Sequence, residues 1–437
     1  MKKRIGLTWM ATAALLLGAC GGESQESSGS NGDSDGKVTL KFHHWVKEDV
    51  GKWEETIAKF EEANPDIDVE SIPLVDNMTA ADYLKQLDLL ASAGEQMDVL
   101  MFNNSSELAK RVDAGLVAPV DSFMEEEGVE MDEEYNNAFP QIDGSYYGLP
   151  MKSVVNLVMM NKSHLDEAGL EIPTDWTWEE YREYAKKLTT DDHKGSYFHT
   201  WPDFYHMVKM HGQSSGNMIL NEDGSSNASN PLLRESLQLR YDLEQTDKSS
   251  VPLSESLSQK LNYRQQFFAQ EVSMVPTASF MITEWGEFTP EFEIAWAPWP
   301  KNSESDPIRG VYGGDLISIA ESSENKEEAY KFIRWMTTEG IVDQSVWVPS
   351  WTGADTNTVL EDLIANTPKP EAVHLESLKH VLSSTEKVET FIPKGYITEA
   401  LNEMNAEAEL YLLGEQDLDT TVQNMEERVQ AVVDANQ

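Results

Sequence analysis

The sequence has little cysteine and little positive charge. Cys20 is the single cysteine among 437 residues, which excludes a disulfide framework and a zinc cluster built from cysteine ligands. Lys and Arg together number 33 against 77 Asp and Glu, so the formal net charge is −44. Such a chain repels phosphates, which excludes nucleic acid as a default partner, and it disfavours acidic ligands for the same reason.

Several catalytic signatures are also missing. Neither G-x-x-x-x-G-K-[ST] nor G-x-G-x-x-G occurs, so nucleotide binding has no support. Residues 212–216 fit G-x-S-x-G, but a helix is expected before them, where a nucleophile elbow requires a strand. No H-E-x-x-H occurs, and we interpret His193, His199, His206 and His211 as surface residues. We therefore expect no catalytic residues, no metal and no cofactor.

The chain is nevertheless rich enough in apolar residues to build more than one core. Hydrophobic residues make up 40% of it, with 12 tryptophans and 14 tyrosines, so it is not a disordered chain. Because single hydrophobic cores stop growing at about 250–300 residues, this length favours two domains. Beyond the N-terminal segment no apolar run reaches 18 residues, so no second membrane segment is expected.

The N-terminus has the parts of an export signal. Basic residues at 2–4 precede a mostly apolar stretch, 5–17, that is too short to span a bilayer as a mature helix. The Leu-Gly-Ala-Cys sequence that ends at Cys20 resembles the lipobox of bacterial lipoproteins. We expect a signal peptide over 1–19, acylation of Cys20, and a flexible Gly- and Ser-rich tether over 20–36. An ordinary secretory signal with an incidental cysteine is the alternative.

Strands and helices alternate over the next hundred residues. The patterns predict strands over 38–45, 67–72 and 98–102, and helices over 50–60 and 80–93. Ser106 is expected to cap a further helix after the third strand. This order predicts an α/β unit with a mainly parallel sheet, and ligands bind beyond the carboxyl ends of such strands. The residues expected at those ends are His44, Trp45, Asn103 and Asn104.

A second unit begins near residue 149. A strongly apolar strand is expected over 154–161. Further on, Thr177 and Glu180 fit a capping box at the start of a helix. Two more helices are expected close to the C-terminus, where apolar residues recur at helical spacing. Three tryptophans lie on helical stripes and are interpreted as core residues; they are Trp53, Trp178 and Trp335.

Short segments spread over residues 37–437 carry a family resemblance. They are 60–69 (FEEANPDIDV), 92–99 (SAGEQMDV), 114–120 (AGLVAPV), 143–150 (DGSYYGLP), 160–180 (MNK to WEE), 313–314 (GG), 326–333 (KEEAYKFI) and 413–414 (LG). Each segment is weak by itself, but their order and spacing are specific. Together they resemble the extracellular solute-binding proteins of sugar ABC importers, the maltose-binding-like group called family 1.

The resemblance implies a two-lobed α/β fold of the periplasmic-binding-protein type II. Each lobe would hold a mainly parallel sheet flanked by helices, with a hinge between the lobes. We place lobe 1 at 37–150 and 309–347, and lobe 2 at 151–308 and 348–437. The crossing segments are expected near 149–153, 308–311 and 348–352. The lobes would close around a ligand, and the closed form would dock on a membrane permease.

Sugar binding calls for flat aromatic rings and hydrogen-bonding groups. By its matching segments, the resemblance implies ligand contacts at His44, Trp45, Asn103, Asn104, Trp201, Asp203, Phe204, Phe280, Gly314, Asp315, Trp351 and Tyr396. Phe280 stands where relatives usually have the tryptophan of Gly-x-Trp. Asp315 would accept hydrogen bonds from sugar hydroxyls.

The export signal and the resemblance together predict a lipid-anchored extracytoplasmic receptor of an ABC importer. It would capture a sugar or oligosaccharide and deliver it to the permease, without enzymatic activity. The expected partners are the ligand, the permease subunits and, through the lipid anchor only, the membrane; the chain would act as a monomer. Two alternatives remain open, namely a receptor for another solute such as a metal or adhesion ligand, and an anchored glycoside hydrolase. The acidic composition favours neutral sugars over uronates.

Overall fold

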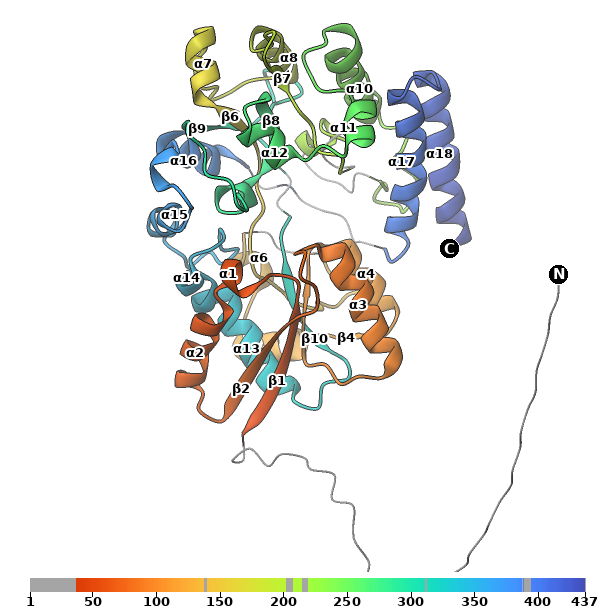
Figure 1. The fold of residues 1–437 in the computed structure, drawn as a ribbon. Coiled ribbons are helices and arrows are strands. Elements are labelled where there is room, and N and C mark those ends of the chain that lie inside the picture. Colours follow the sequence, from red (N-terminus) through yellow and green to blue (C-terminus); the bar gives the residue numbers. More distant parts are fainter. Residues whose placement is uncertain are drawn as a thin grey trace, which may run out of the picture. The chain divides into compact units, whose positions relative to one another are not determined.

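The computed structural model describes residues 37–136, 140–201, 207–213, 219–310, 313–386, 388 and 394–436. Two β-sheets organise this part of the chain, and each is flanked by helices (Figure 1). We call the sheet that contains the first strands, with its helices, lobe 1, and the other lobe 2. The chain passes from lobe 1 to lobe 2 after residue 150, returns before residue 316, and leaves again beyond residue 346.

Lobe 1 has a six-stranded sheet in the order β2-β1-β3-β10-β4, with β5 paired to β10. The strands β1, β2 and β3 run parallel, whereas β10 runs antiparallel to β3, β4 and β5. Figure 1 shows β10, drawn in cyan, among the orange strands of the N-terminal segment. The bounds are β1 (Val38–His44), β2 (Ile67–Pro73), β3 (Val99–Phe102), β4 (Val117–Ala118), β5 (Leu149–Pro150) and β10 (Leu316–Ala320).

Lobe 2 has a four-stranded sheet in the order β7-β8-β6-β9. The central strand β6 runs antiparallel to β8 and β9, and only β7 and β8 are parallel. The bounds are β6 (Asn156–Asn161), β7 (Lys194–Ser196), β8 (Val272–Ala278) and β9 (Ile294–Pro298).

The prediction of mainly parallel sheets was wrong for lobe 2, and lobe 1 is mixed. The reason lies in the crossings. The start of β10 at Leu316 pairs with the end of β3 at Phe102, because β10 enters lobe 1 from the junction toward which β3 points. In lobe 2, β6 leaves the junction at Asn156 and β8 returns to it at Ala278, so this pair must be antiparallel.

Helices cover both sheets. Those of lobe 1 are α1 (Glu48–Gly51), α2 (Trp53–Ala63), α3 (Ala80–Ala93), α4 (Ser105–Asp113), α5 (Asp121–Glu127), α6 (Met131–Glu134), α13 (Lys326–Trp335), η4 (Met336–Gly340) and α14 (Ile341–Gln344). Those of lobe 2 are α7 (Lys162–Ala168), α8 (Trp178–Lys187), η1 (Met210–Gly212), α10 (Pro231–Tyr241), η2 (Asp242–Thr246), α11 (Leu253–Gln259), α12 (Tyr263–Phe268), η3 (Ser279–Ile282), α15 (Thr356–Ala365), η5 (Pro370–Ala372), α16 (Leu375–Ser384), α17 (Ile397–Leu412) and α18 (Leu418–Ala435).

Local signals at helix ends were partly correct. The capping box of Thr177 and Glu180 is present at the start of α8. The cap of α4 is Asn104 rather than Ser106, because the Asn104 side chain accepts a hydrogen bond from the backbone N–H of Glu107 at 2.9 Å. The helix expected over 50–60 is two helices, since Lys52 adopts a left-handed conformation with φ of 50° between α1 and α2.

Each lobe has its own hydrophobic core. One apolar cluster fills lobe 1, and two clusters lie in lobe 2, to which alternate residues of β6 contribute: Val158 and Met160 to one, Leu157 and Met159 to the other. A strand whose two sets of side chains enter different clusters is covered on both faces. The indole rings of Trp53 and Trp178 are buried as expected, whereas Trp335 is half-buried.

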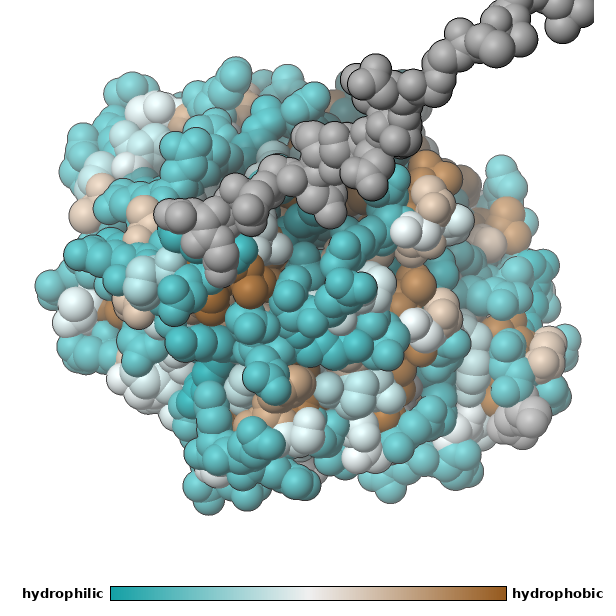
Figure 2. All heavy atoms as spheres, turned by 90° about the horizontal axis from the view of Figure 1, so that it is seen from below, coloured by the Kyte–Doolittle hydropathy of each residue, from teal (hydrophilic) through white to brown (hydrophobic). Residues whose placement is uncertain are grey.

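Polar residues cover most of one face of the molecule. The face seen from below in Figure 2 is mostly hydrophilic, with small, separated hydrophobic patches. Among the described helices, none combines the length and the apolar character needed to cross a bilayer.

Candidate functional site at the lobe junction

Three extended segments lie side by side at the junction. Ser153 N–H donates to the carbonyl of Val348 at 2.8 Å, and Val154 N–H donates to the carbonyl of Gly313 at 2.7 Å. The segment 149–155 is therefore hydrogen-bonded on one side to the segment around 348 and on the other to the one around 313. Such a strip of single extended chains between two cores can bend without disturbing either core. Residues 311 and 312 lie outside the described residues, and the first of them ends the second predicted crossing, 308–311.

Side chains of the central segment alternate between the two faces of this strip. Lys152 points to one face, where it meets charged groups of both lobes. Ser153 and Val155 point to the opposite face, where they line a cavity of about 520 Å³ together with Trp351 and Leu360. We call the Lys152 side the front of the hinge and the cavity side the rear.

At the front, Lys152 is held by two carboxylates. Its Nζ lies 2.9 Å from Asp315 Oδ2 and 3.8 Å from Glu284 Oε1. It also lies 4.9 Å from the ring centre of Trp347. Burial acts against the charge of Lys152, but the two carboxylates raise its pKa above the usual value. Burial raises the pKa of Asp315, an effect that Lys152 partly offsets.

Glu284 links this lysine to a second cation. Arg264 Nε donates to the backbone carbonyl of Glu284 at 2.7 Å, and an Arg264 guanidinium nitrogen lies 3.4 Å from Glu284 Oε2. Trp347 Nε1 donates to Glu284 Oε1 at 3.2 Å. Lys152, Asp315, Glu284 and Arg264 thus form a group of two cations and two carboxylates, which we call the junction ion cluster. It joins the residue directly before β10 and Trp347 of lobe 1 to α12 and the segment after η3 in lobe 2.

Aromatic rings of lobe 2 lie next to this cluster. The Arg264 guanidinium lies 4.8 Å from the ring centre of Tyr263. Trp201 lies 5.6 Å from Tyr263 in an edge-to-face arrangement and 6.1 Å from Phe280. Trp201 is 47% exposed, which makes it one of few large apolar side chains that reach solvent in the described structure. We call Trp201, Tyr263 and Phe280 the aromatic platform.

His199 and His211 are buried in lobe 2, and one of them, His199, supports the platform. His199 stacks on Tyr263 at 3.8 Å, and His211 shares a 3.0 Å hydrogen bond with Asn156. The expectation that these two are surface histidines was therefore wrong: ring packing and the junction strand enclose both. His206 lies outside the described residues. Over the part of the chain that the structure describes, no three His, Cys, Asp or Glu residues are grouped as a metal site.

On the lobe 1 side, His44 and Trp45 are core residues in this conformation. His44 is fully buried between Phe42 and Trp53, and its Nε2 shares a 2.8 Å hydrogen bond with Ser71 Oγ. Burial lowers the pKa of His44 to about 3. Trp45 packs on Tyr83.

The two asparagines after β3 differ from each other. The side-chain oxygen of Asn104 is used by the cap of α4. The side-chain oxygen of Asn103 is buried and, within the described structure, has no hydrogen-bond partner. A buried amide oxygen without a donor favours a ligand that brings one.

Other predicted residues are scattered around the junction. Tyr396 is half-buried at the start of α17. Gly314 directly precedes Asp315 in the extended segment that pairs with Val154. Trp351 lies at the rear, away from the aromatic platform, and its Nε1 donates to Glu134 Oε1 at 2.9 Å. Asp203, Phe204 and Cys20 lie outside the described residues.

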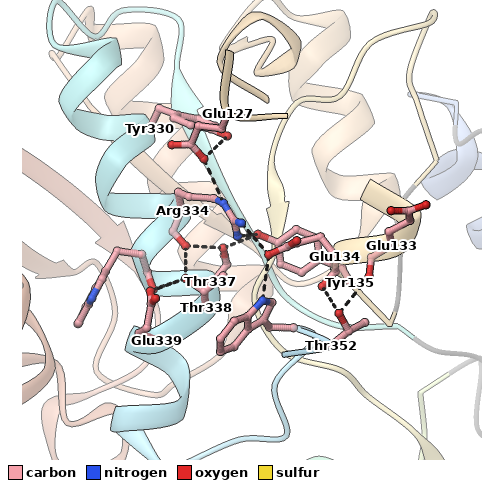
Figure 3. A network of polar contacts seen from close by, with 12 residues as sticks. Glu127, Glu133, Glu134, Tyr135, Tyr330, Arg334, Thr337, Thr338, Glu339 and Thr352 are labelled. Atoms are coloured by element: carbon pink, nitrogen blue, oxygen red, sulfur yellow. Dashed lines mark hydrogen bonds and ion pairs between the residues drawn. The ribbon is translucent and has the colours of Figure 1, made fainter. Parts of the chain in front are cut away.

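Glu134, which accepts the hydrogen bond from Trp351, belongs to a polar network of lobe 1 (Figure 3). Glu134 also accepts from Arg334 at 2.6 Å, and Arg334 donates to Tyr135 Oη at 3.0 Å. Thr352 N–H donates to the backbone carbonyl of Glu134 at 3.0 Å. The third crossing segment is therefore fastened to lobe 1 as far as Thr352.

The two lobes also touch where α17 meets α4. Thr398 at the start of α17 in lobe 2 donates to Glu107 of α4 in lobe 1 at 3.5 Å. A β-carbon added at Gly395 would lie 2.0 Å from Asp113 Oδ2, so the backbone there passes close to α4. These contacts bring α4 of lobe 1 close to the start of α17 in lobe 2.

Sequence reasoning missed Lys152, Glu284, Arg264 and Tyr263. Lys152 did carry a signal, because it is the only charged residue in the apolar stretch 149–160, where an isolated lysine needs a partner. The other three lie among many charged and aromatic residues and have no comparable signal.

Comparisons with known proteins agree on one family. Residues 46–342 match the family model described as bacterial extracellular solute-binding protein. A putative binding protein of Brucella abortus is 27% identical over 309 residues, which cover 69% of this chain and 72% of that protein. The multiple sugar-binding protein of Streptococcus mutans is 26% identical over 359 residues, which cover 77% of this chain and 79% of that protein.

Solved structures agree as well. The crystal structure of a cyclic alpha-maltosyl-1,6-maltose binding protein from Arthrobacter globiformis aligns with a TM-score of 0.72 at 17% identity, over 92% of this chain and all of that one. This similarity confirms the predicted two-lobed α/β fold.

Proposed function

Because the chain belongs to the bacterial extracellular solute-binding protein family, we propose that it captures a sugar or oligosaccharide between its lobes and delivers it to an ABC permease. The observation that carries this proposal is the aromatic platform at the front of the hinge. Trp201 reaches solvent there beside Tyr263 and Phe280. Flat aromatic faces suit the C–H faces of pyranose rings. The sugar-binding relative from Streptococcus mutans supports the choice of ligand.

Polar groups around the platform would satisfy the hydroxyls. The unpartnered side-chain oxygen of Asn103 is available to a hydroxyl donor from lobe 1. Tyr396, half-buried in lobe 2, offers a phenol. We keep Trp201, Phe280, Asn103, Tyr396 and Gly314 as ligand contacts, together with Asp203 and Phe204. We assign His44, Trp45 and Asn104 to supporting roles and Trp351 to the hinge.

Binding would work through closure of the lobes. A ligand that touches both lobes binds the closed form better and shifts the population toward it. A micromolar affinity corresponds to about −8 kcal/mol, which a few stacked rings and satisfied hydroxyls can supply. The ligand leaves chemically unchanged, and the closed monomer presents both lobes to the permease.

We further propose that Cys20 carries the lipid anchor. It is the single cysteine of the sequence and stands directly after Leu-Gly-Ala. Burial of acyl chains contributes about 0.8 kcal/mol per CH₂, so two or more chains anchor a protein stably. The tether 20–36 would hold the body, with lobe 1 at 37–150 and 309–347 and lobe 2 at 151–308 and 348–437, outside the membrane.

Isothermal titration against a glycan panel tests the proposal. The mature chain with Cys20→Ser, which cannot be acylated, should bind at least one neutral oligosaccharide. Trp201→Ala should weaken that binding about tenfold, or roughly 1.4 kcal/mol. The matched control is Leu89→Ala, since Leu89 is an even more exposed side chain on α3 of lobe 1. Absence of heat and of a tryptophan fluorescence change with every glycan would refute the proposal.

A further inference from the structure

We propose that the site takes uncharged saccharides and rejects carboxylated or phosphorylated ones, and that Glu284 is the residue that sets this selectivity. The inference rests on the proposed function and adds the chemical class of the ligand. It follows from the charges of the junction ion cluster and from the position of that cluster beside the aromatic platform.

The cluster is balanced. Lys152 faces Asp315 at 2.9 Å, and Arg264 faces Glu284 at 3.4 Å. Glu284 also lies 3.8 Å from Lys152, so it is the point where the two ion pairs meet. Among the ion pairs of the described residues, no other carboxylate contacts both cations. Both cations are therefore paired with carboxylates of the protein, and neither is available to pair with an anionic ligand.

The balanced cluster adjoins the place where a sugar ring would stack. The Arg264 guanidinium lies 4.8 Å from the ring centre of Tyr263, and Tyr263 lies 5.6 Å from the exposed ring of Trp201. Arg264 is thus one aromatic ring away from the platform's exposed edge. A ligand carboxylate on that edge would meet Arg264 only by competing with Glu284.

Such a competition disfavours the anionic ligand. Removing an anion from water is strongly unfavourable unless a cation pairs with it, and the balanced cluster offers no unpaired cation to offset that cost. The formal net charge of −44 adds a repulsion at longer range, which salt screens beyond about 10 Å. A neutral ring needs only stacking and ordinary hydrogen bonds, so it meets none of these costs.

Glu284, rather than Asp315, is the carboxylate that decides whether a ligand at the junction meets an unpaired positive charge. The Glu284 side chain is 21% exposed and that of Asp315 is 5% exposed, so only Glu284 borders the solvent-accessible junction. Glu284→Gln keeps an acceptor for Trp347 Nε1 and leaves the pair of Lys152 with Asp315 intact. It removes the only side-chain carboxylate in contact with Arg264 in the described structure, so the junction gains one unbalanced positive charge.

The test compares neutral oligosaccharides with oligouronates of matching ring size and length by isothermal titration. The mature chain with Cys20→Ser should bind a neutral glycan and show at least tenfold weaker binding of its uronate counterpart. With Glu284→Gln the ratio of uronate to neutral affinity should rise at least tenfold, and the gain should shrink as salt is raised. In the double variant Glu284→Gln and Arg264→Gln the affinity ratio should not rise. That result would attribute the rise in Glu284→Gln to the Arg264 guanidinium, which has lost its carboxylate partner there.

Asp419→Asn is the matched control. Asp419 pairs with Arg234 at the outer surface of α18, so this change removes the same charge far from the junction and should leave the ratio unchanged. Thermal melting of each variant verifies that it is folded. Equal affinity of the unaltered chain for uronates and neutral glycans, or no gain in folded Glu284→Gln, overturns the inference alone. Absence of binding to both neutral and acidic glycans overturns the proposed function and the inference with it.

Discussion

At the scale of single residues, Lys152 holds the junction together. It is a buried lysine on an extended hinge segment, and its partners are Asp315, directly before β10 of lobe 1, and Glu284, in the segment after η3 of lobe 2. Pairs of this kind stabilise little relative to apolar packing, but breaking them is expensive because a buried charge is left alone. The pair of Lys152 and Asp315 therefore adds little net stability. Removing Lys152 alone would still be costly, because the buried charge of Asp315 would lose its partner.

Lys152→Met tests this role. The variant leaves Asp315 buried without its cation, so the free energy of unfolding should fall by about 3 kcal/mol in chemical denaturation. Adding Asp315→Asn should recover part of the loss. Lys59→Met, which breaks an exposed pair with Asp343, should cost less than about 0.5 kcal/mol. A loss as small in Lys152→Met would contradict the assignment.

His44 gives the fold a specific response to acid. Burial lowers its pKa from the usual 6.5 to about 3, so the unfolded chain takes up a proton that the folded chain refuses over this range. The stability contribution is complete above pH 6.5 and is lost as the pH falls toward 3, by up to about 1.4 kcal/mol per pH unit.

Replacement of His44 should flatten this response. His44→Gln should lose less stability than the unaltered chain between pH 7 and 5, by about 1–2 kcal/mol in urea titrations at each pH. Other buried histidines contribute equally to both proteins. His380→Gln, at a half-buried position on α16 outside the lobe 1 core, should keep the original slope. Parallel pH profiles for His44→Gln and the unaltered chain would exclude His44 as the source.

At the scale of elements, the start of lobe 1 depends on one glycine. Gly51 ends α1, and a β-carbon placed there would lie 2.2 Å from Trp53 Nε1. The indole of Trp53 needs this space, because it packs on Phe42 and donates to the carbonyl of Val46 at 2.9 Å. The turn between α1 and α2 is thus shaped by ring packing.

Gly51→Ala should displace the Trp53 ring. Overpacking of this kind costs about 1–3 kcal/mol, so the melting temperature should drop and the buried tryptophan emission should shift to the red. Gly94→Ala provides a comparison, because its added β-carbon meets no atom and only its positive φ of 74° opposes the change. An unchanged emission spectrum in Gly51→Ala would show that the ring position does not depend on the glycine.

How far the sequence predicts these elements depends on the range of the interactions. Helix 80–93 and the capping box at Thr177 were predicted correctly because their signals lie within a few residues. The break at Lys52 was not, since it follows from contacts of Trp53 with other elements. Strand directions were misjudged because crossings between lobes fix them. Lys152 and Glu284 are 132 positions apart, and no local pattern pairs them.

At the scale of the whole molecule, the ion cluster explains how the lobes can separate at little cost. Lys152 keeps its 2.9 Å contact with Asp315, and Arg264 keeps its contacts with Glu284. Opening of the front would break the 3.8 Å contact of Lys152 with Glu284 and the hydrogen bond from Trp347. Each half that results is neutral, so neither lobe is left with an unpaired buried charge. A ligand then needs only a modest energy to shift the population.

The distance between the lobes with and without a glycan tests the central claim most directly. Cys20→Ser leaves the chain without cysteine, so Leu89→Cys in α3 and Leu257→Cys in α11 can carry a spin label on each lobe. Pulsed electron resonance should give a broad distance distribution without ligand and a narrower, displaced one with the neutral oligosaccharide found by titration. Identical distributions in both conditions, with binding verified on the labelled protein, would contradict capture by lobe closure.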